Sequence, residues 1–566
     1  MIEETIVNVF KKIFINLNIP NNDIKIIKSN RPDLCDYQFD GVFKLTRILN
    51  DNPQNIGFKI IDEIKKLPEY NDVFANIEFA NPGFINITIS NKLINSCLEK
   101  MQNNNKYNIK MPPHERYIID YGGYNIAKPL HIGHLRPTII GESIKRILQF
   151  LNQETIADVH LGDFGLQMGQ VIYGILRDKK TVNDIDIDYL NIIYPEISSL
   201  CKEDKEVNLA CAAITKSLQD NEPDYLDYWH KIIDVSLEDI KKITEYFDVH
   251  FDLWEGESDS FKYFKPLEAL LNEKNLLHIS EGANVIDVKL PTDNKPMPPM
   301  IFQKSNGAYL YDSTDLATIY ERKQKFNPDH IIYVTDFRQN LHFEQVFRAS
   351  ELAGLIPYKS LEHAYNGTIN GQDGKPFKTR KGDAPKLAEL IDLVKETFLN
   401  QKESNKDMSK EDLDKIVNSI IKFADLQNSR EKDYIFDIDK FSDVVGKTGP
   451  YILYSYVRVN KILQNYPEIP NKLSDNIYNK QDRDLRMSIL DLENQINNAF
   501  INSMPSYIAN YVYNLCTLIN IFYQTNHLNN LEDKEKLSDW LYILNLANTI
   551  IKDMLKLLMI DVPSAM

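Results

Sequence analysis

The sequence lacks the features of a membrane protein or a disulfide-stabilised protein. No run of about 18 apolar residues occurs, which excludes a bilayer-spanning helix. Glu3 and Glu4 stand where a secretory signal needs positive charge. The 5 cysteines are scattered, without a CxxC pair or a nearby histidine at zinc-finger spacing, so we expect buried thiols and no zinc site. These absences favour a cytoplasmic location.

The chain also lacks an excess of basic residues. Its formal net charge is −16, whereas nucleic-acid binding usually leaves a basic footprint. Any RNA partner must therefore meet local basic patches. With 566 residues, of which 43% are hydrophobic, the chain can bury several cores and should divide into several domains.

Three regions differ in their apolar patterns. Residues 1–110 combine an amphipathic helix with "NIEFANPGFINITIS", two alternating strands around a turn, and we expect a small α+β domain. In residues 111–384, strands alternate with helices, which predicts an α/β, Rossmann-type parallel sheet with a mostly helical insertion at about 175–300. Residues 385–566 carry helical spacing throughout, which predicts an all-α bundle.

Within the predicted sheet, two later segments have strand character. "HIIYV" at 330–334 and "LEHAYNGTI" at 361–369 are expected to continue the sheet after the insertion. No fixed-period repeat accompanies them.

The stretch "NIAKPLHIGHLRPTII" places two histidines where a strand passes into a helix. His131 and His134 are expected at or before the helix N-terminus, where free N–H groups and the helix dipole bind anions. Gly133 lets a ligand approach the backbone, Lys128 adds a point charge, and Pro137 suits a first helical turn. This pattern predicts a polyphosphate site whose imidazoles donate hydrogen bonds to transition-state oxygens. Histidines that only decorate a loop are the alternative.

A second basic segment, "GKPFKTRKGDAPKL", lies about 240 residues further along the chain. It clusters Lys375, Lys378, Arg380 and Lys381 between two glycines. The segment is either a solvated surface or a mobile cationic arm that neutralises a leaving pyrophosphate.

These two segments resemble the H-I-G-H signature and the Lys-Met-Ser-Lys-Ser loop of class I aminoacyl-tRNA synthetases, with Lys378 and Lys381 at the first and fourth loop positions. Neighbouring motifs are similar to those of arginyl-tRNA synthetases. "NIAKP" precedes H-I-G-H, a Gly-Asp-Phe-Gly run follows at 162–165, and residues 446–462 resemble the anticodon-domain signature. The resemblance covers nearly the whole chain.

The resemblance implies that the chain is an arginine-tRNA ligase. Arginine would attack MgATP to give arginyl adenylate and pyrophosphate, and the ribose hydroxyl of tRNA(Arg) would then take the arginyl group. His131 and His134 would contact transition-state phosphate oxygens, and Lys128, Lys378 and Lys381 the β- and γ-phosphates. Mg²⁺ would arrive with ATP. The family's need for tRNA in the first step is expected too, and we expect a monomer.

An arginine pocket can be sought in "YLYDSTDLATIYERK". A guanidinium is best recognised by a carboxylate beside an aromatic or hydroxyl group. If a helix begins near Asp312, Tyr311 and Asp315 project to the same side; the alternative is that Asp315 only complements the helix dipole. The resemblance adds to this arginine site Asp120, Asn125, Glu257 and Gln339, with His342 as a support. At Gly123 and Tyr124 the chain departs from the family, which usually has Ser and Pro there.

Aromatic residues near both ends are candidates for RNA contact, because unpaired bases stack on aromatic rings. Most such rings simply belong to the core, and an ordinary hairpin turn explains "NPGFIN" equally well. The resemblance makes the N-terminal residues a D-loop-binding module. The predicted tRNA-binding residues are Asn81, Phe84, Asn86, Tyr454, Arg458, Tyr523 and Met566.

Three other functions remain open from the sequence. The chain could be an inactive tRNA-binding paralogue, or another class I synthetase such as the cysteine enzyme, although clustered Cys and His zinc ligands are missing. A small-molecule adenylate-forming enzyme can share H-x-G-H, but it would not require the long aromatic-rich helical region.

Overall fold

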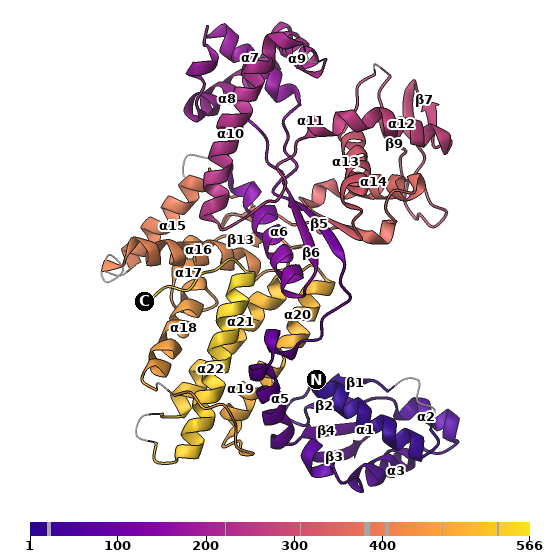
Figure 1. The fold of residues 1–566 in the computed structure, drawn as a ribbon, viewed down its shortest axis with the longest axis vertical. Helices are drawn as coiled ribbons and strands as arrows, with labels where there is room; N and C mark the ends of the chain where they lie inside the picture. The colour runs from indigo at the N-terminus through magenta and orange to yellow at the C-terminus, as the bar shows by residue number, and fades with distance from the viewer. Residues whose placement is uncertain are drawn as a thin grey trace. The chain divides into compact units, whose positions relative to one another are not determined.

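The structure, a computed structural model, describes residues 1–19, 24–220, 222–305, 307–377, 385–401, 407–466, 468–528 and 531–566. Its elements fall into two compact units, each composed of segments that are distant in the sequence (Figure 1). The first unit contains Met1–Lys110, Arg458–Asn494 and Tyr513–Ile551. The second unit contains Met111–Val457, Gln495–Val512 and Lys552–Met566.

The first unit contains a four-stranded antiparallel sheet in the order β1-β2-β4-β3. The two strands expected around the Asn81 turn are β3 and β4, so this prediction is confirmed. Helix α1 lies near this sheet and contributes Phe10, whose ring centroid is 5.0 Å from that of Phe39 on β2. The strands are β1 (Ile26–Lys28), β2 (Tyr37–Phe39), β3 (Phe74–Ala80) and β4 (Phe84–Ile89).

Charged residues near the end of the chain complete this unit. The Arg483 guanidinium donates to both carboxylate oxygens of Asp36, at 3.1 and 2.8 Å. Arg486 is fully buried and donates to Asn95 Oδ1 at 2.6 Å. The helices of this unit are α1 (Ile2–Asn16), α2 (Val42–Leu49), α3 (Pro53–Lys65), α4 (Tyr70–Val73), α5 (Asn91–Asn103) and α19 (Lys480–Leu490).

The second unit is built on a parallel sheet in the order β11-β10-β5-β6. Strand β10 (His330–Val334) has the predicted bounds. It pairs with β5 (Arg116–Tyr121) on one side and with β11 (Leu361–His363) on the other. The strand expected over 361–369 is wrong beyond His363. A separate strand, β12 (Ile369–Asn370), pairs instead with β13 (Tyr434–Ile435).

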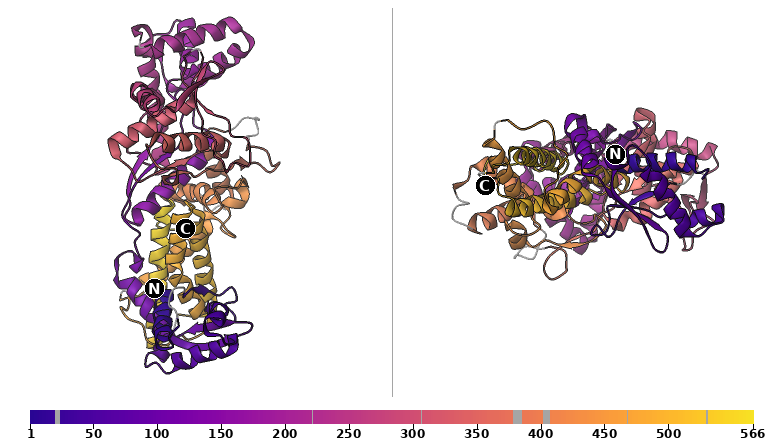
Figure 2. Two further views of the ribbon diagram at one scale, coloured as in Figure 1. Left: turned by 90° about the vertical axis from the view of Figure 1, so that its right-hand side faces the viewer. Right: turned by 90° about the horizontal axis from the view of Figure 1, so that it is seen from below.

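Helices interrupt the sheet after β6 (Glu154–Asp158), as the sequence predicts. Helices α7 to α10 form one group at the top of Figure 1. The same purple and magenta group is at the top of the turned view in Figure 2. The insertion is not helical to its end, because β7, β8 and β9 form a small antiparallel sheet. Its elements are α7 (Leu166–Arg177), α8 (Ile187–Glu203), α9 (Lys205–Gln219), α10 (Leu226–Tyr246), α11 (Glu257–Ser260), α12 (Phe264–Glu273), β7 (Leu277–Ser280), β8 (Ala283–Ile286) and β9 (Met300–Gln303).

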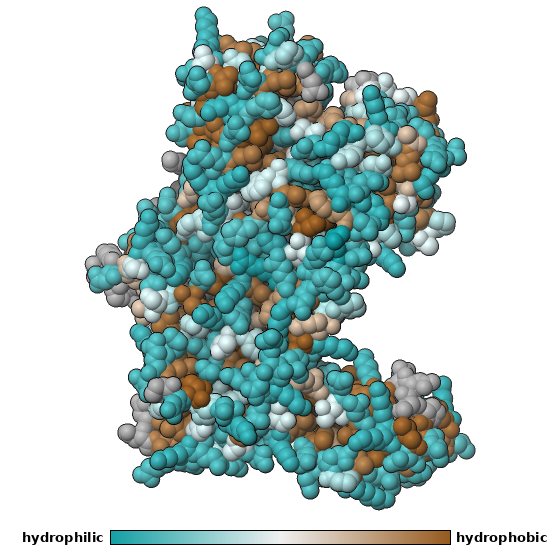
Figure 3. Space-filling model, in the orientation of Figure 1, coloured by the Kyte–Doolittle hydropathy of each residue, from teal (hydrophilic) through white to brown (hydrophobic). Residues whose placement is uncertain are grey.

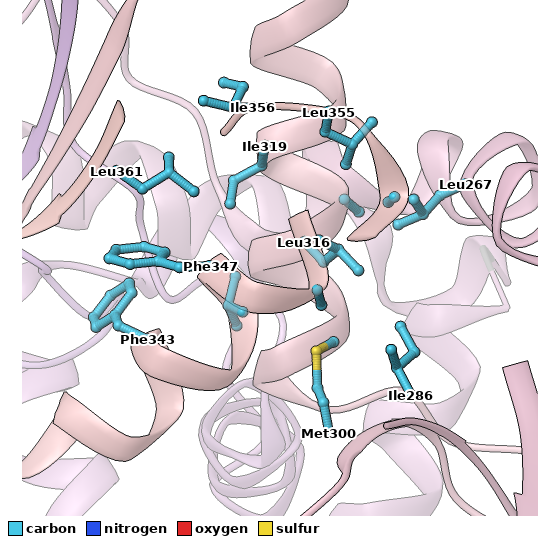
Figure 4. Close-up of a cluster of buried hydrophobic side chains, with 14 of the residues drawn as sticks. Leu267, Ile286, Met300, Leu316, Ile319, Phe343, Phe347, Leu355, Ile356 and Leu361 are labelled. Atoms are coloured by element: carbon cyan, nitrogen blue, oxygen red, sulfur yellow. The ribbon is translucent and has the colours of Figure 1, made fainter. Parts of the chain in front are cut away.

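A hydrophobic core joins this small sheet to the helices that follow it (Figure 4). Leu316 and Ile319 of α13 (Tyr311–Phe326) lie with Phe343 and Phe347 of α14 (Asn340–Ala353) in one buried cluster. Each such side chain contributes about 1.5–3 kcal/mol when fully buried. This core holds the start of α13, which carries two of the predicted arginine-binding residues.

Residues 385–566 are mostly helical, as predicted, but strand β13 interrupts the expected all-α pattern. Their helices not yet named are α15 (Leu387–Gln401), α16 (Lys410–Leu426), α17 (Ile438–Ser442), α18 (Gly449–Gln464), α20 (Leu492–Ile501), α21 (Ser506–Thr525) and α22 (Lys534–Leu557). Helix α6 (Ile132–Phe150) belongs to the region of the parallel sheet. Hydrophilic side chains dominate the face shown in Figure 3, with brown areas over the α7–α10 group. Within the described ranges, no helix is long and apolar enough to cross a bilayer.

Candidate active site

The two histidines lie at the start of α6, directly after the loop that leaves β5. His131 is the N-cap residue, and its Nδ1 accepts a hydrogen bond from Gly133 N at 3.0 Å. His134 returns to the cap, with Nδ1 accepting from His131 N at 3.1 Å. The ring centroids are 4.0 Å apart. Pro137 does not lie in the first turn as expected, because the helix begins at Ile132 and includes it as its sixth residue.

This capping fixes the tautomer of both rings. Because each Nδ1 accepts a backbone hydrogen bond, the proton of the neutral imidazole is on Nε2, where it can be donated to a ligand. Burial, reinforced by the Lys128 charge, lowers the pKa of His131. Burial and the neighbouring His131 lower the pKa of His134 to about 3. Both rings are therefore neutral hydrogen-bond donors at pH 7.

The chain returns to this cap after the second basic segment. Ile132 N donates to Pro385 O at 3.1 Å, and Leu387 N donates to Leu130 O at 2.8 Å. The predicted phosphate-binding residues Lys378 and Lys381 lie outside the described residues. The described part of the chain resumes at Pro385, which contacts the H-I-G-H motif.

Lys128 and Asn125 lie in the loop before the cap. The Lys128 ammonium stands over the Tyr194 ring, 5.0 Å from its centroid. Asn125 forms a parallel bridge with Gly162. A Cβ at residue 162 would lie only 2.6 Å from Asn125 Oδ1, so the glycine of the Gly-Asp-Phe-Gly run leaves room for this amide.

Sequence reasoning missed the polar contacts that hold the Gly-Asp-Phe-Gly loop. The buried Asp163 carboxylate accepts from Ser258 N at 3.0 Å and from Ser258 Oγ at 2.5 Å. Trp229 Nε1 donates to Asp163 O at 2.9 Å. These bonds fix Glu257 beside the loop.

A buried charge cluster at the ends of β5 and β6 was also missed. Arg322 Nη2 lies 2.5 Å from Asp120 Oδ2 and 2.5 Å from Asp158 Oδ2. Asp120, one of the predicted arginine-binding residues, is thus already paired. Both ring nitrogens of His160 are buried and have no hydrogen-bond partner in the described structure. Burial lowers the pKa of His160, but Asp120, Asp315 and Asp158 raise it above its usual value overall.

A cavity of about 610 Å³, within the usual range of ligand pockets, lies between the Gly-Asp-Phe-Gly loop and the start of α13. Of the six predicted arginine-binding residues, Tyr311 and Glu257 line this cavity. Its lining does not include Asp120, Asn125, Asp315 or Gln339. Burial raises the pKa of Glu257 to about 7, with His160 opposing the shift. The other lining residues are Phe164, Gly165, Lys216, Gln219, Asp220, Phe261, Gly307, Ala308, Tyr309, Leu310 and Thr314.

Asp315 contacts a histidine in this structure. His342 Nε2 forms a very short ion pair with Asp315 Oδ2, and its Nδ1 lies 2.7 Å from Asp312 Oδ1. Burial lowers the pKa of His342, but the two carboxylates overcome this effect and raise it to about 10. His342 is therefore a cation, and it pairs with Asp315, the carboxylate that is predicted to bind the guanidinium of the substrate arginine. Gln339 is exposed at the end of a short 3-10 helix (Phe337–Gln339).

The predicted N-terminal RNA contacts differ in their accessibility. Asn81 is exposed in the turn and Phe84 is half-buried. Asn86 is buried inside β4, and its Oδ1 accepts from Gln38 Nε2 at 2.8 Å. The amide oxygen of Asn86, a predicted tRNA-binding residue, is thus engaged within the sheet.

The predicted C-terminal contacts lie on α18, α21 and the last residue. Tyr454 is 46% exposed on α18. The Arg458 guanidinium stacks over the Tyr523 ring, 4.4 Å from its centroid. Met566 is half-buried. Among the described residues, no three His, Cys, Asp or Glu side chains are arranged to hold a metal ion.

A parallel sheet whose first strand leads into a helix capped by H-I-G-H, with residues 385–387 returning to that cap, defines the catalytic domain of a class I aminoacyl-tRNA synthetase. Residues 96–438 match the family described as "tRNA synthetases class I (R), catalytic domain". Residues 452–566 match the DALR anticodon binding domain, and residues 1–89 match the arginyl tRNA synthetase N terminal domain. The chain belongs to the arginyl-tRNA synthetase family.

Individual relatives span the same length. The arginine-tRNA ligase of Alkaliphilus oremlandii is 37% identical over 561 residues, covering 95% of each chain. That of Agathobacter rectalis is 36% identical and covers 98% of each. Arginyl-tRNA synthetase from Plasmodium falciparum has a similar structure, with a TM-score of 0.80, 25% identity and coverage of 100% of this chain and 99% of that one. The Thermus thermophilus enzyme shares the fold, with a TM-score of 0.82 at 19% identity over the whole of both chains.

Proposed function

We propose that this chain activates L-arginine with ATP and transfers it to the 3′ end of tRNA(Arg). The observation that carries the proposal is the cap of α6, where two neutral imidazoles keep their Nε2 hydrogens for a ligand. Donors fixed before the reaction stabilise charge that develops on the α-phosphate oxygens. Full-length similarity to arginine-tRNA ligases supports the choice of amino acid.

In this proposal, His131 and His134 donate to phosphate oxygens in the transition state for adenylate formation. Gly133 keeps the cap open to the nucleotide. Lys128, Lys378 and Lys381 neutralise the β- and γ-phosphates as pyrophosphate leaves. Mg²⁺ is carried with ATP, and it supplies further charge neutralisation on the phosphates. No zinc is required.

The arginine site is the cavity between α11 and α13. Tyr311 and Glu257 line it, and Asp315 receives the guanidinium once His342 yields its place. The family positions Asn125, Asp120 and Gln339 complete the proposed site. We assign Asp120 a charge-balancing role, because Arg322 already binds its carboxylate.

The tRNA is proposed to contact both ends of the chain. Functionally, we divide the chain into a D-loop-binding region (1–110), a catalytic region (111–384) and an anticodon-binding region (385–566). Exposed Asn81 and half-buried Phe84 are the better N-terminal candidates, because the Asn86 oxygen is engaged inside the sheet. The C-terminal candidates are Tyr454, Arg458, Tyr523 and Met566. We further propose a cytoplasmic monomer.

The test is charging of unfractionated tRNA with each radiolabelled amino acid in the presence of ATP and Mg²⁺. The parent should charge arginine alone, and His134→Ala should lose that activity. His278→Ala is the matched control, because His278 is exposed on β7. Retained tRNA binding without charging would indicate an inactive paralogue. Charging with another amino acid would refute the pocket assignment.

A further inference from the structure

Two cysteines that are scattered in the sequence meet in the insertion. Cys201 on α8 donates a thiol hydrogen bond to Cys211 on α9, with 3.6 Å between the sulfurs. The sharp connection at Asp204, which caps α9 by accepting from two backbone N–H groups, turns the chain between them. We propose that Cys201 and Cys211 are an oxidation site that forms a reversible disulfide and thereby lowers arginine activation.

The geometry requires only a local movement. A disulfide bond is about 2.05 Å long, so the sulfurs must approach each other by roughly 1.5 Å. Rotation of the two side chains and a small shift of one helix can supply this approach. In a reducing compartment, a disulfide of this kind is expected to be transient and redox-sensing rather than structural.

The two thiols differ in a way that suits sequential oxidation. Of the five cysteines, only Cys201 is not buried, so it is the thiol that an oxidant reaches. Cys211 is fully buried, and burial together with the Cys201 hydrogen bond raises its pKa to about 12. Cys211 is thus unreactive towards solvent and attacks only after its neighbour has been oxidised.

With hydrogen peroxide as oxidant, the Cys201 sulfur attacks one peroxide oxygen. The O–O bond breaks, the first water leaves, and Cys201 becomes a sulfenic acid. The Cys211 sulfur then attacks the Cys201 sulfur, the S–O bond breaks, and the second water leaves with the Cys211 thiol proton. Two thiols lose two electrons in total, and the peroxide is reduced to two waters. A dithiol reductant reverses the reaction by thiol–disulfide exchange.

One of the two helices that carry the proposed disulfide, α9, also lines the proposed arginine cavity. Helix α7 crosses α9 so closely that a Cβ at Gly169 would lie 2.1 Å from Cys211 O. Helix α7 starts directly after the Gly-Asp-Phe-Gly loop, and α9 ends with Lys216 and Gln219 in the cavity wall. A shift of Cys211 towards Cys201 therefore moves α9 against α7 and displaces this wall.

The effect on activity rests on the proposed function, whereas the disulfide itself does not. The full-length chain is treated with hydrogen peroxide, quenched, digested and mapped by mass spectrometry, and arginine-dependent exchange between ATP and pyrophosphate is measured with tRNA present. We expect a Cys201–Cys211 linkage in the parent and a rise of roughly 5-fold or more in the arginine KM, which dithiothreitol reverses.

Variants separate this site from general oxidation damage. Cys201→Ser and Cys211→Ala should resist peroxide, whereas Cys516→Ser, which changes a buried cysteine elsewhere, should respond as the parent does. Absence of the linkage in oxidised parent protein would overturn the proposal, as would equal peroxide sensitivity of Cys201→Ser. A linkage with unchanged KM would overturn its regulatory part. An untreated parent without arginine-dependent exchange would contradict the proposed function instead.

Discussion

Replacing Arg322 by methionine should strongly destabilise the catalytic unit, because this guanidinium neutralises two buried carboxylates. Its side chain is 1% exposed and lies 2.5 Å from both Asp120 and Asp158. Breaking a buried ion pair by removing one partner costs about 3–5 kcal/mol, or a roughly 10²- to 10⁴-fold lower ratio of folded to unfolded protein. Here one substitution leaves two carboxylates without their cation.

The loss should depend on pH with a definite sign. In the parent, burial raises the pKa of Asp158 and the Arg322 charge opposes that shift. Without the guanidinium, the folded-state pKa of Asp158 rises further above the unfolded value of about 3.9. The stability contribution of such groups is present at low pH and is lost as pH rises through the folded pKa. The deficit of Arg322→Met should therefore be larger at pH 8 than at pH 5.

Urea unfolding at both pH values measures this loss of stability. Hydrogen exchange of peptides from β5 and β6 shows whether the loss is located at these two strands. Arg338→Met is the matched control, because Arg338 pairs with Asp336 at a 75% exposed position and should change stability by less than about 1 kcal/mol. Adding Asp158→Asn to Arg322→Met should restore part of the loss. A deficit below about 1 kcal/mol, or one that is equal at both pH values, would refute the reasoning.

Other predictions concern the active site. His134→Ala should slow adenylate formation by about 10²- to 10³-fold in single-turnover assays, since it removes one fixed donor to the transition state; an unchanged rate would remove His134 from catalysis. Asp315→Asn should raise the arginine KM by roughly tenfold or more and leave the ATP KM unchanged, and equal arginine affinity would exclude Asp315 from the pocket. Gly162→Ala should also raise the arginine KM, because its Cβ would lie 2.6 Å from Asn125 Oδ1. Burial lowers the pKa of His134 to about 3, well below its unfolded value. The contribution of neutral His134 to folding stability is therefore present above about pH 6.5 and falls as pH decreases. In urea titrations, the free energy of unfolding of His134→Gln should decrease less steeply with falling pH than that of the parent.

The sequence predicts features whose signal is local. Strand β10 is a short, mostly apolar run, and the residues that form the cap of α6 are adjacent in the sequence around His131. Arg322 has no such signal, since its carboxylate partner Asp120 lies 202 residues away in the chain. The strands β7 to β9 were missed because they are short and partly solvent-facing, as the 77% exposure of Ile279 shows. Cys201 and Cys211 meet only because the chain turns between two helices.

The discontinuous first unit has a consequence for synthesis of the chain. Residues 1–110 leave the ribosome long before Arg483 and Arg486, the partners of Asp36 and Asn95, are synthesised. At about 5–20 residues per second, this delay is roughly 20 to 75 s. During that time the N-terminal sheet exists without the helix that completes its polar contacts. Nascent chains should therefore expose this surface to chaperones long before the enzyme is complete.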